Sequence, residues 1–480
     1  MKKFYLTTPI YYINSIPTVG SAYTTIIADI LARWHRLSGK VFYLTGLDEN
    51  SIKTVKAAKE KGYEDIQKYT NDMAEQWKKT WKILNINYDG FIRTTESRHK
   101  KIVREFFSKM YKKGDIYKGK YEGLYCDDCE AYLNESDLVN DLCPNHKKKP
   151  NFISEENYFF KLSKYQDKIL KYIEKNPKFL LPESRKKEII NFIKSGLKDI
   201  SISRQNAKWG IVLNKKENQI AWCWFDAVLN YVSGAEGNWP ADLHLIGKDI
   251  TIFHSIYFIG FLLSRWDETK LPKQIFAHGF FTVNGQKISK SLGNSIDPVY
   301  FSKKYSTDAL RYYLAREIPF GDDGDFSEDA LKSRINNELA NELGNLVNRT
   351  LTLVEKKLNN KVKKGKIELN LDVKNVEDYM KKLELHNALS EIFKFISECN
   401  KYINDNEIWK LEKKELEIKL YNLLEALRII NILLNSFIPE TSEIINKQLN
   451  IKSGKLEDCK FGVIKNYNIK KGDILFKKVE

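Results

Sequence analysis

Three short segments near the start of the chain place the strongest limit on its fold. Residues 4–8 are predicted to form a short buried strand, and residues 22–37 carry apolar side chains at helical spacing. Gly39 ends this helix, and the apolar residues 41–44 are predicted to form a second strand. A strand, a helix and a strand in this order make a parallel unit, so the sequence predicts an α/β fold built on a parallel sheet.

The remaining sequence adds a second α/β part and a long helical part. A chain of 480 residues is too long for one hydrophobic core, so several domains are expected. Residues 51–117 are expected to be mainly helical, and residues 118–150 are rich in turns. A second α/β run starts near Ile220, with strands expected at 243–246 and 275–278. Beyond about residue 330 glycines are few, and a helical bundle is predicted from three long stretches and one basic linker: 336–358, 376–405, 416–449 and the linker 361–366.

Charge and cysteine content narrow the class of protein. The net charge of +16 favours a polyanionic partner, with nucleic acid first, although a lysine-rich codon bias would give the same balance. Three of the six cysteines are close together, and Cys223, Cys399 and Cys459 are expected to be scattered core thiols. The start of the chain has no long apolar run, and no stretch of roughly 18 apolar residues occurs. We therefore expect no signal peptide, no membrane span and a reducing, cytoplasmic compartment.

Cysteine and histidine in the turn-rich segment have the spacing of a metal site. Cys126 and Cys129 form a C-x2-C pair, and Cys143 and His146 form a C-x2-H pair that is separated from the first pair by thirteen residues. Two tight turns of this kind bring four zinc-compatible ligands into a tetrahedron, which leaves no open coordination position. The sequence therefore predicts a structural Zn²⁺ site. The alternative is two unrelated turns in which Cys and His only pack.

A Gly- and Asn-punctuated loop carries a pair of lysines. Lys287, Ser289 and Lys290 lie in the pentapeptide KISKS, so two ammonium groups three residues apart are flanked by small hydroxyl side chains. Such a pair can stabilise the negative charge that grows on the phosphates of ATP during a reaction. By itself the motif could also be a solvated Lys/Ser loop, because such strings arise by chance in basic chains.

Two polar segments follow the first two predicted strands. Thr18, Gly20 and Ser21 precede the first helix, whose N-terminus could receive a phosphate, although Ser21 could equally be an ordinary N-cap. Asp48, in the segment TGLDENS, follows the second strand, and ligands of open α/β sheets bind at the carboxyl ends of strands. Asp48 could therefore bind an ammonium group, or it could cap the next helix. Aromatic residues around Trp224 and His254 are either core residues or the walls of an apolar pocket.

Together these residues resemble the methionyl-tRNA synthetase family in its short bacterial form. The matching blocks keep the family's order and spacing: TTPIYYIN, ILARWHRLSGK, YEGLYCDDC with CPNH, ISRQNAKWGI, WFDAVLNYVSG, HLIGKDI, HGFFTVNGQKISKSLGN, DALRYYLAREIPFGDDGDFSE and ELGNLVNRT. The resemblance implies a Rossmann-type parallel sheet that is split by a zinc-knuckle connective insertion and followed by an all-α anticodon-binding bundle. The implied parts are the two catalytic halves 1–117 and 219–285, the insertion 118–218 with its knuckle at 118–150, the KISKS loop and stem-contact region 286–335, and the anticodon-binding domain 336–480.

The resemblance also implies a reaction and its partners. The family joins L-methionine to ATP as methionyl-adenylate and then transfers the methionyl group to tRNA(Met). ATP is thus a substrate, Mg²⁺ is expected to arrive with it, and Zn²⁺ is expected to be structural. Because the C-terminal dimerisation module of longer family members is absent, a monomer is expected.

Each motif then has an implied role. The resemblance assigns the methionine pocket to Ile10, Tyr12, Asp48, Trp224 and His254, with Asp48 binding the α-ammonium group. Catalysis and ATP binding are assigned to Thr18, Gly20, Ser21, Lys287, Ser289 and Lys290. Anticodon reading is assigned to Asn345, Arg349 and Trp409, although bundle packing is an alternative role for Trp409.

This chain departs from the family at positions near the phosphates. The family's HIGH motif is TVGS here, so Thr18 and Ser21 stand where histidines are usual. In the neighbouring TDEHG block the histidine is Asn50 and the glycine is Ser51. Loss of one transition-state donor usually costs about 3 kcal/mol, although these smaller residues can still donate hydrogen bonds. Ile408 also replaces the proline that usually precedes the anticodon tryptophan.

Three hypotheses follow from these departures. The chain is a working but slow synthetase, or a repurposed paralogue that binds tRNA or methionine without efficient aminoacylation, or a tRNA-binding scaffold. Survival of the zinc ligands, the methionine pocket, the KISKS lysines and the anticodon tryptophan favours the slow enzyme.

Overall fold

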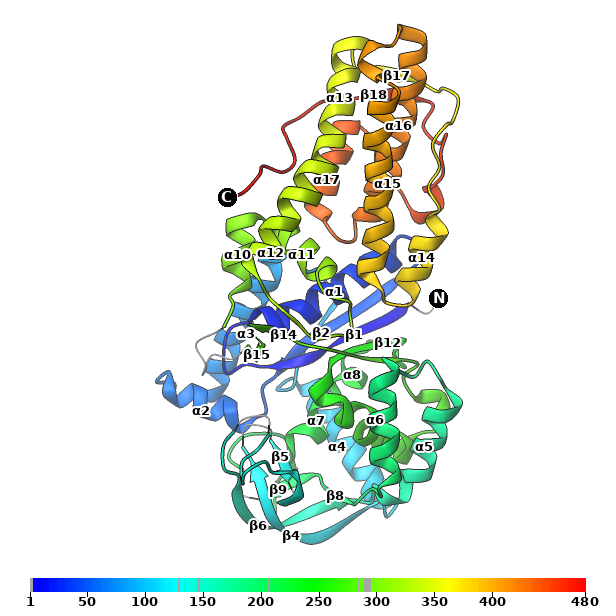
Figure 1. Cartoon of the computed structure of the whole chain (residues 1–480). Coiled ribbons are helices and arrows are strands. Elements are labelled where there is room, and N and C mark those ends of the chain that lie inside the picture. The colour runs from blue at the N-terminus through cyan, green and yellow to red at the C-terminus, as the bar shows by residue number, and fades with distance from the viewer. Residues whose placement is uncertain are drawn as a thin grey trace. The chain divides into compact units, whose positions relative to one another are not determined.

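The protein divides into two compact units, which are described in turn. The structure is a computed structural model that describes residues 3–127, 130–133, 135–144, 147–205, 207–283, 285–288 and 295–480, with the backbone alone for Ala131, Gln286 and Lys287 (Figure 1). The first unit comprises Met1–Pro17, Val41–Lys82 and Asn87–His278. The second comprises Thr18–Lys40, Ile83–Ile86 and Gly279–Glu480.

A parallel sheet of six strands forms the centre of the first unit. Its strands pair in the order β3 (Gly90–Arg93), β2 (Val41–Asp48), β1 (Phe4–Tyr12), β12 (Leu243–Gly247), β13 (Ile275–His278) and β7 (Leu180–Leu181). β2 and β13 are buried along their whole length, as expected for a parallel sheet covered on both faces. The predicted parallel α/β sheet is confirmed.

The first strand is longer than the sequence pattern indicated. Pairing with β2 is regular up to Thr7, shifts between Thr7 and Ile10, and then continues to Tyr12. Pro9 lies in the irregular stretch and has no N–H to donate, so the ladder is interrupted there without being ended. The strand therefore carries Ile10 and Tyr12, two residues apart and on the same face, to the carboxyl edge of the sheet.

In the described part of the first unit, two smaller sheets and eight α-helices surround this sheet. One sheet pairs β5 (Ala131–Leu133), β4 (Ile116–Cys126), β6 (Asn151–Phe160) and β8 (Ile200–Ser201), and the other pairs β10 (Val212–Asn214), β11 (Gln219–Ala221) and β9 (Ser203–Gln205). The helices are α2 (Ile52–Glu60), α3 (Ile66–Ile83), α4 (Ser97–Lys112), α5 (Gln166–Lys175), α6 (Glu183–Lys194), α7 (Cys223–Ala227), α8 (Asn230–Ser233) and α9 (Phe258–Arg265).

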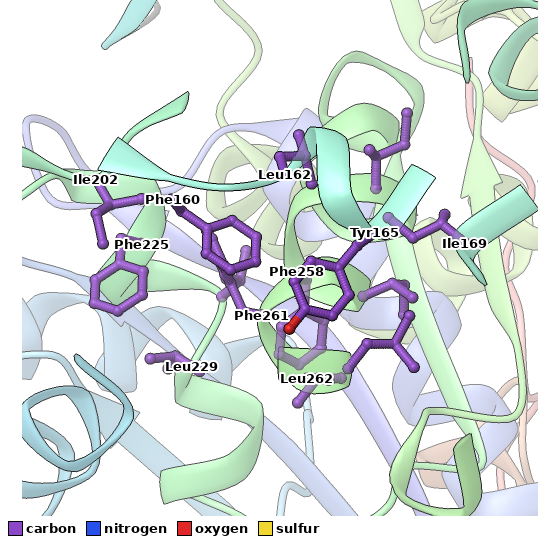
Figure 2. Packing of buried hydrophobic residues seen from close by; sticks show 14 of the residues in the cluster. Phe160, Leu162, Tyr165, Ile169, Ile202, Phe225, Leu229, Phe258, Phe261 and Leu262 are labelled. Carbon is purple, nitrogen blue, oxygen red and sulfur yellow. The ribbon is translucent and has the colours of Figure 1, made fainter. Parts of the chain in front are cut away.

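The main core of this unit fixes the elements that lead to the site. Figure 2 shows Phe160 of β6, Phe225 of α7 and Phe261 of α9 among its packed side chains. The Phe160 ring lies edge-on to Phe261 at 5.1 Å, and Phe225 does the same at 5.0 Å. α7 and α9 are thereby held in one apolar cluster.

The second unit contains α1 and a mostly helical C-terminal region. Its helices are α1 (Val19–Arg36), α10 (Pro298–Tyr305), α11 (Thr307–Arg316), α12 (Glu328–Arg334), α13 (Asn345–Leu358), α14 (Val373–Lys381), α15 (Leu385–Asp405), α16 (Lys413–Leu434) and α17 (Pro439–Leu449). A small sheet pairs β15 (Gln286–Lys287), β14 (Phe281–Val283) and β16 (Gly324–Asp325). In Figure 1, α13, α15 and α16 run side by side. Among the described residues, no helix combines the length and the apolar character needed to cross a membrane.

The predicted helical bundle is present, with three differences in detail. Two of the expected long helices are broken, one between α14 and α15 and one between α16, which ends at Leu434, and α17, which begins at Pro439. The segment 335–344 is wound as a π-helix that runs directly into α13. The expected linker 361–366 is wrong in part, because β17 (Lys361–Lys363) pairs with β18 (Asn466–Asn468).

One buried arginine ties α1 to the bundle. Arg311 of α11 is fully buried, and its guanidinium donates to Asp29 Oδ2 of α1 at 2.7 Å. It also donates to the carbonyl oxygens of Ser436 and Phe437, which connect α16 to α17, at 3.1 and 3.0 Å. The helix that follows Thr18 therefore shares a buried cation with the C-terminal helices.

Candidate active site

A polar site begins where β1 and β2 end. Tyr12 and Asp48 are register partners at the last paired position of the two strands. Asp48 is only 4% exposed. The carboxyl end of a parallel sheet is where such folds bind ligands, so the structure places two predicted site residues together at the expected edge.

Only one of the two oxygens of the Asp48 carboxyl group has a hydrogen-bond partner among the described residues. Its Oδ2 accepts a hydrogen bond from Cys223 Sγ at 3.2 Å, whereas its buried Oδ1 has no hydrogen-bond partner among the described residues. Burial, followed by the nearby carboxyl groups of Asp226 and Glu130, raises the pKa of Asp48, and Lys53 opposes this rise. An unpaired buried carboxylate is costly unless a cation meets it. Asp48 can therefore bind an ammonium group.

The side-chain amide nitrogen of Asn50 makes its hydrogen bonds within the protein. Its Nδ2 donates to Asp226 Oδ2 at 3.1 Å and to the Thr94 carbonyl oxygen at 3.2 Å. Since an amide nitrogen carries only two hydrogens, neither remains for a ligand in this arrangement. His99 lies on the other side of Asp226, with its Nε2 3.5 Å from Oδ1, and burial lowers the pKa of His99 to about 3.

A group of aromatic rings packs together in the same unit. Trp224 stacks on Phe253 with ring centroids 3.8 Å apart and planes 5° apart, and His254 lies edge-on to Trp224 at 6.4 Å. His254 Nδ1 contacts the Ile250 carbonyl oxygen at 2.9 Å, and His254 Nε2 contacts the Tyr231 hydroxyl at 2.7 Å. Burial lowers the pKa of His254 to about 4. His254 is thus a neutral imidazole, with Nδ1 as donor and Nε2 as acceptor in this network.

α7 connects the aromatic rings with the Asp48 carboxyl group. Cys223 contacts Asp48 and lies 3.9 Å from the Tyr12 hydroxyl, and Trp224 is the next residue along the helix. Ile10 is half-buried against the small core cluster that includes Phe42.

The TVGS segment forms the start of α1 in the second unit. Thr18 is the N-cap, and Ser21 is the third helical residue, so the alternative that Ser21 is the N-cap is wrong. Ser21 Oγ donates to the Thr18 carbonyl oxygen at 2.9 Å and accepts from Thr18 N at 3.1 Å. Gly20 is exposed, and a Cβ added there would meet only Thr18 Oγ1, at an ordinary 3.8 Å. Packing within the described chain therefore does not require glycine at this position.

The segment that carries the KISKS lysines begins in a short hairpin of the same unit. Lys287 lies in β15, and its backbone pairs with Thr282 of β14, while Ser289 and Lys290 fall outside the described residues. Asp325 braces the hairpin, because its carboxylate accepts from the Thr282 hydroxyl and from Gly285 N at 3.0 Å. These hydrogen bonds lower the pKa of Asp325, with that of Thr282 contributing most.

The predicted metal ligands are only partly described. Cys126 ends β4 and is buried, and Cys143 is fully buried. Cys143 opens a tight turn, since Lys147 N donates to the Cys143 carbonyl oxygen at 2.8 Å and Cys143 N donates to the Lys148 carbonyl oxygen at 2.9 Å. Cys129 and His146 lie outside the described residues. Within the described ranges, no three potential metal ligands come together.

The predicted anticodon residues lie on the bundle. Arg349 of α13 donates to Asn404 Oδ1 of α15 at 2.7 Å, and Asn345 Nδ2 lies 3.4 Å from Asn400 Oδ1. Trp409 is 42% exposed in the short turn after α15, whereas the preceding Ile408 is fully buried. The buried isoleucine anchors the turn, so Trp409 is not a core packing residue.

Sequence reasoning missed two residues at this site. Cys223 was expected to be a scattered core thiol, yet it touches Asp48. Glu130 comes from the turn-rich segment, and its Oε1 accepts from Ile52 N at the start of α2 at 2.6 Å. The position of Cys223 next to Trp224 was the only available signal for the first residue. The sequence has no pattern that brings Glu130 to α2.

Family models match nearly the whole chain. A model described as "tRNA synthetases class I (M)" matches residues 4–149 and 133–351. A second, described as "Anticodon-binding domain of tRNA ligase", matches residues 367–470. The methionine–tRNA ligase of Caldanaerobacter subterraneus is 43% identical over 100% of this chain and 79% of its own length. That of Rickettsia conorii is 42% identical over 99% of both chains.

A solved structure agrees with these matches. The Mycobacterium tuberculosis methionyl-tRNA synthetase in complex with methionyl-adenylate is 35% identical, covers 99% of this chain and 100% of its own, and superimposes with a TM-score of 0.94. Sequence and fold thus agree along the full length of the chain. The chain belongs to the methionine–tRNA ligase family of class I tRNA synthetases.

Proposed function

We propose that this protein is a methionine–tRNA ligase that activates L-methionine with ATP and transfers the methionyl group to tRNA(Met). One observation carries the proposal: a buried carboxylate oxygen without a partner, Asp48 Oδ1, lies at the carboxyl edge of the sheet in a chain that matches this family throughout. The α-ammonium group of an amino acid supplies the charge that this oxygen lacks.

The same edge suits the rest of the amino acid. Tyr12, Ile10, Trp224 and the neutral His254 would contact the thioether side chain, since a soft, unbranched side chain prefers aromatic and aliphatic walls. A protonated imidazole would be a poor wall for an apolar group, and burial keeps His254 neutral.

Chemistry on ATP would involve the two motifs of the second unit. A methionine carboxylate oxygen forms a bond to the α-phosphorus while the bond to the pyrophosphate oxygen breaks. Lys287 and Lys290 would stabilise the charge on the leaving pyrophosphate, with Ser289 beside them. Thr18, Gly20 and Ser21 would place the N-terminus of α1 near the nucleotide, and Mg²⁺ would be held mainly by phosphate oxygens.

On the bundle, tRNA recognition would use Asn345, Arg349 and Trp409. The exposed indole offers a flat surface on which an unpaired base can stack. The two polar residues are already oriented by Asn400 and Asn404, which suits them to hydrogen bonding with base edges.

For the metal, we propose that Cys126, Cys129, Cys143 and His146 hold one Zn²⁺. The two described thiols are buried, and Cys143 opens a turn closed by two backbone hydrogen bonds, as a compact ligand pair requires. The ion would cross-link the insertion. Metal analysis of the purified protein should give about one zinc per chain, and Cys143→Ser should remove it. We also propose that the protein is a monomer and acts in the cytoplasm.

Methionine-dependent exchange of pyrophosphate into ATP tests the function directly. We expect exchange with L-methionine, and charging of tRNA(Met) by the same preparation. A repurposed paralogue or a scaffold would bind tRNA with a strong salt dependence but would give no exchange. The comparisons do not favour that alternative.

A further inference from the structure

Cys223 lies beside two of the residues that are assigned to the methionine pocket. Cys223 is the first residue of α7, and its Sγ lies between two pocket residues, 3.2 Å from Asp48 Oδ2 and 3.9 Å from the Tyr12 hydroxyl oxygen. The preceding Trp222 is fixed by its indole, which donates to the Glu130 carbonyl oxygen at 2.8 Å. The thiol is therefore held by the fold before any ligand arrives.

The thiol is the donor in its contact with Asp48. Burial raises the pKa of Cys223, and the nearby Asp48 and Glu130 carboxyl groups raise it further. The sulfur thus keeps its proton and donates it to Oδ2, with the Glu130 carboxyl group as a second acceptor beside the same thiol. This is the single hydrogen bond to the Asp48 side chain among the described residues.

The hydrogen bond fixes both the direction and the charge of the carboxylate. With Oδ2 held by the thiol, Oδ1 is left for another donor. Asp226 and Glu130 oppose ionisation of Asp48, while the thiol and Lys53, whose Nζ lies 3.9 Å from the Tyr12 ring centroid, favour it. Without the thiol the carboxyl group would be freer to rotate and harder to ionise.

We propose that Cys223 is a positioning residue for methionine, which holds Asp48 so that its second oxygen meets the α-ammonium group of the substrate. This inference rests on the proposed function. It goes beyond that function by assigning substrate affinity to a thiol that touches Asp48 and not the reacting atoms.

Three substitutions separate the hydrogen bond from the volume of the side chain. Cys223→Ser keeps a donor, Cys223→Val keeps an apolar side chain of similar size without a donor, and Cys223→Ala removes both. Pyrophosphate exchange gives the KM values for methionine and ATP, and calorimetry without ATP gives the methionine Kd. We expect Cys223→Val and Cys223→Ala to raise the KM and Kd for methionine about tenfold, because a hydrogen bond to a charged group is lost. The KM for ATP should change by less than about twofold, and Cys223→Ser should stay within about threefold of the wild-type protein.

A pH profile adds a result that simple loss of packing would not produce. In Cys223→Val the acidic limb of kcat/KM for methionine should move to higher pH, because the ionised form of Asp48 loses a donor. Cys399→Ala is the matched control, since Cys399 is fully buried in α15 of the other unit and should leave the methionine KM unchanged.

The possible outcomes can be told apart. If the wild-type protein exchanges pyrophosphate but Cys223→Val binds methionine normally, the inference is overturned and the function stands. If Ser and Val weaken binding equally, side-chain shape and not the hydrogen bond is responsible, and the inference is again overturned. Absence of exchange in the wild-type protein would overturn the function and this inference together. If Cys223→Val does not fold, Cys223→Ala is judged by the same criteria.

Discussion

Asn50 Nδ2 lies 3.1 Å from Asp226 Oδ2, although the family places a histidine at position 50. The amide therefore satisfies a buried carboxylate. The side chain at position 50 thus makes internal hydrogen bonds in this chain, and we expect them to contribute to its stability.

Asn50→Ala should lower the free energy of unfolding by about 1 to 3 kcal/mol. The substitution leaves the buried Asp226 Oδ2 without this donor, and an unsatisfied buried acceptor costs that much. Urea unfolding measures the change. Asn370→Ala, at an exposed loop position, should change stability by less than about 0.5 kcal/mol. Equal effects of the two substitutions would show that the amide does not stabilise Asp226.

Asp48→Asn should abolish methionine activation and at the same time stabilise the free protein at neutral pH. The pKa of Asp48 is raised in the folded state, so between the unfolded value near 4 and the folded value the folded protein retains a proton that the unfolded chain loses. The free energy of unfolding therefore falls as pH rises through that window. Removing the carboxylate should therefore raise the free energy of unfolding above that pH window.

Thermal unfolding at pH 4 and pH 8 tests this sign. The gain of Asp48→Asn over the wild-type protein should be larger at pH 8. Methionine affinity of the wild-type protein should fall as pH drops, because the ammonium group needs the ionised form of Asp48. A variant that unfolds more easily at both pH values would contradict the assignment.

Restoring the two family histidines should accelerate adenylate formation. In this structure Ser21 Oγ already donates to the Thr18 carbonyl oxygen, so its hydroxyl stabilises the helix start. Thr18→His combined with Ser21→His adds two donors, and one transition-state donor is worth about a hundredfold or more in rate. Rapid-quench measurement should show a gain of at least about tenfold with little change in the KM for methionine.

Ser21→Ala provides the comparison for that experiment. If Ser21 serves only the helix start, its loss should cost about 1 kcal/mol of stability and leave adenylation unchanged. If the double histidine variant shows no gain while Ser21→Ala loses activity, the site has been rebuilt around the hydroxyl groups.

Trp409→Ala should weaken tRNA charging without affecting pyrophosphate exchange. The side chain is 42% exposed, so its removal should cost little stability. Loss of one stacked base is worth about 1 to 3 kcal/mol, which predicts roughly a 5- to 150-fold fall in kcat/KM for tRNA. Ile444→Ala, an exposed apolar residue of α17, is the control and should leave charging unchanged.

Runs of apolar residues in the sequence correctly predicted the strands that are buried on both faces. The apolar runs at β12 and β13 gave the strands nearly to the residue, because strands buried on both faces have continuous apolar sequences. The end of β1 was not predicted, since pairing resumes after Pro9 only because β2 lies alongside. The strand 361–363 was missed for the same reason, as its partner is about a hundred residues away.

The candidate site shows the same limit more strongly. Asp48 was predicted from its place after a strand, and Trp224 from its aromatic neighbours. Cys223 and Asp48 are 175 residues apart, and neither periodicity nor spacing signals their contact. That the amide of Asn50 is already engaged also became visible only once Asp226 and Thr94 were placed around it.

The buried guanidinium of Arg311 limits how this enzyme can be shortened. It neutralises Asp29 of α1 and also depends on two carbonyl oxygens contributed by the turn at 436–437. A fragment cut before α13 would keep the ion pair and the Arg311 contacts with the carbonyl oxygens of Leu84 and Asn85, but would lose the two acceptors at 436–437. The same cut would expose the buried face of α11, where Tyr312 packs against Phe393. We therefore expect a fragment that extends through Phe437 to be more stable than one cut before α13.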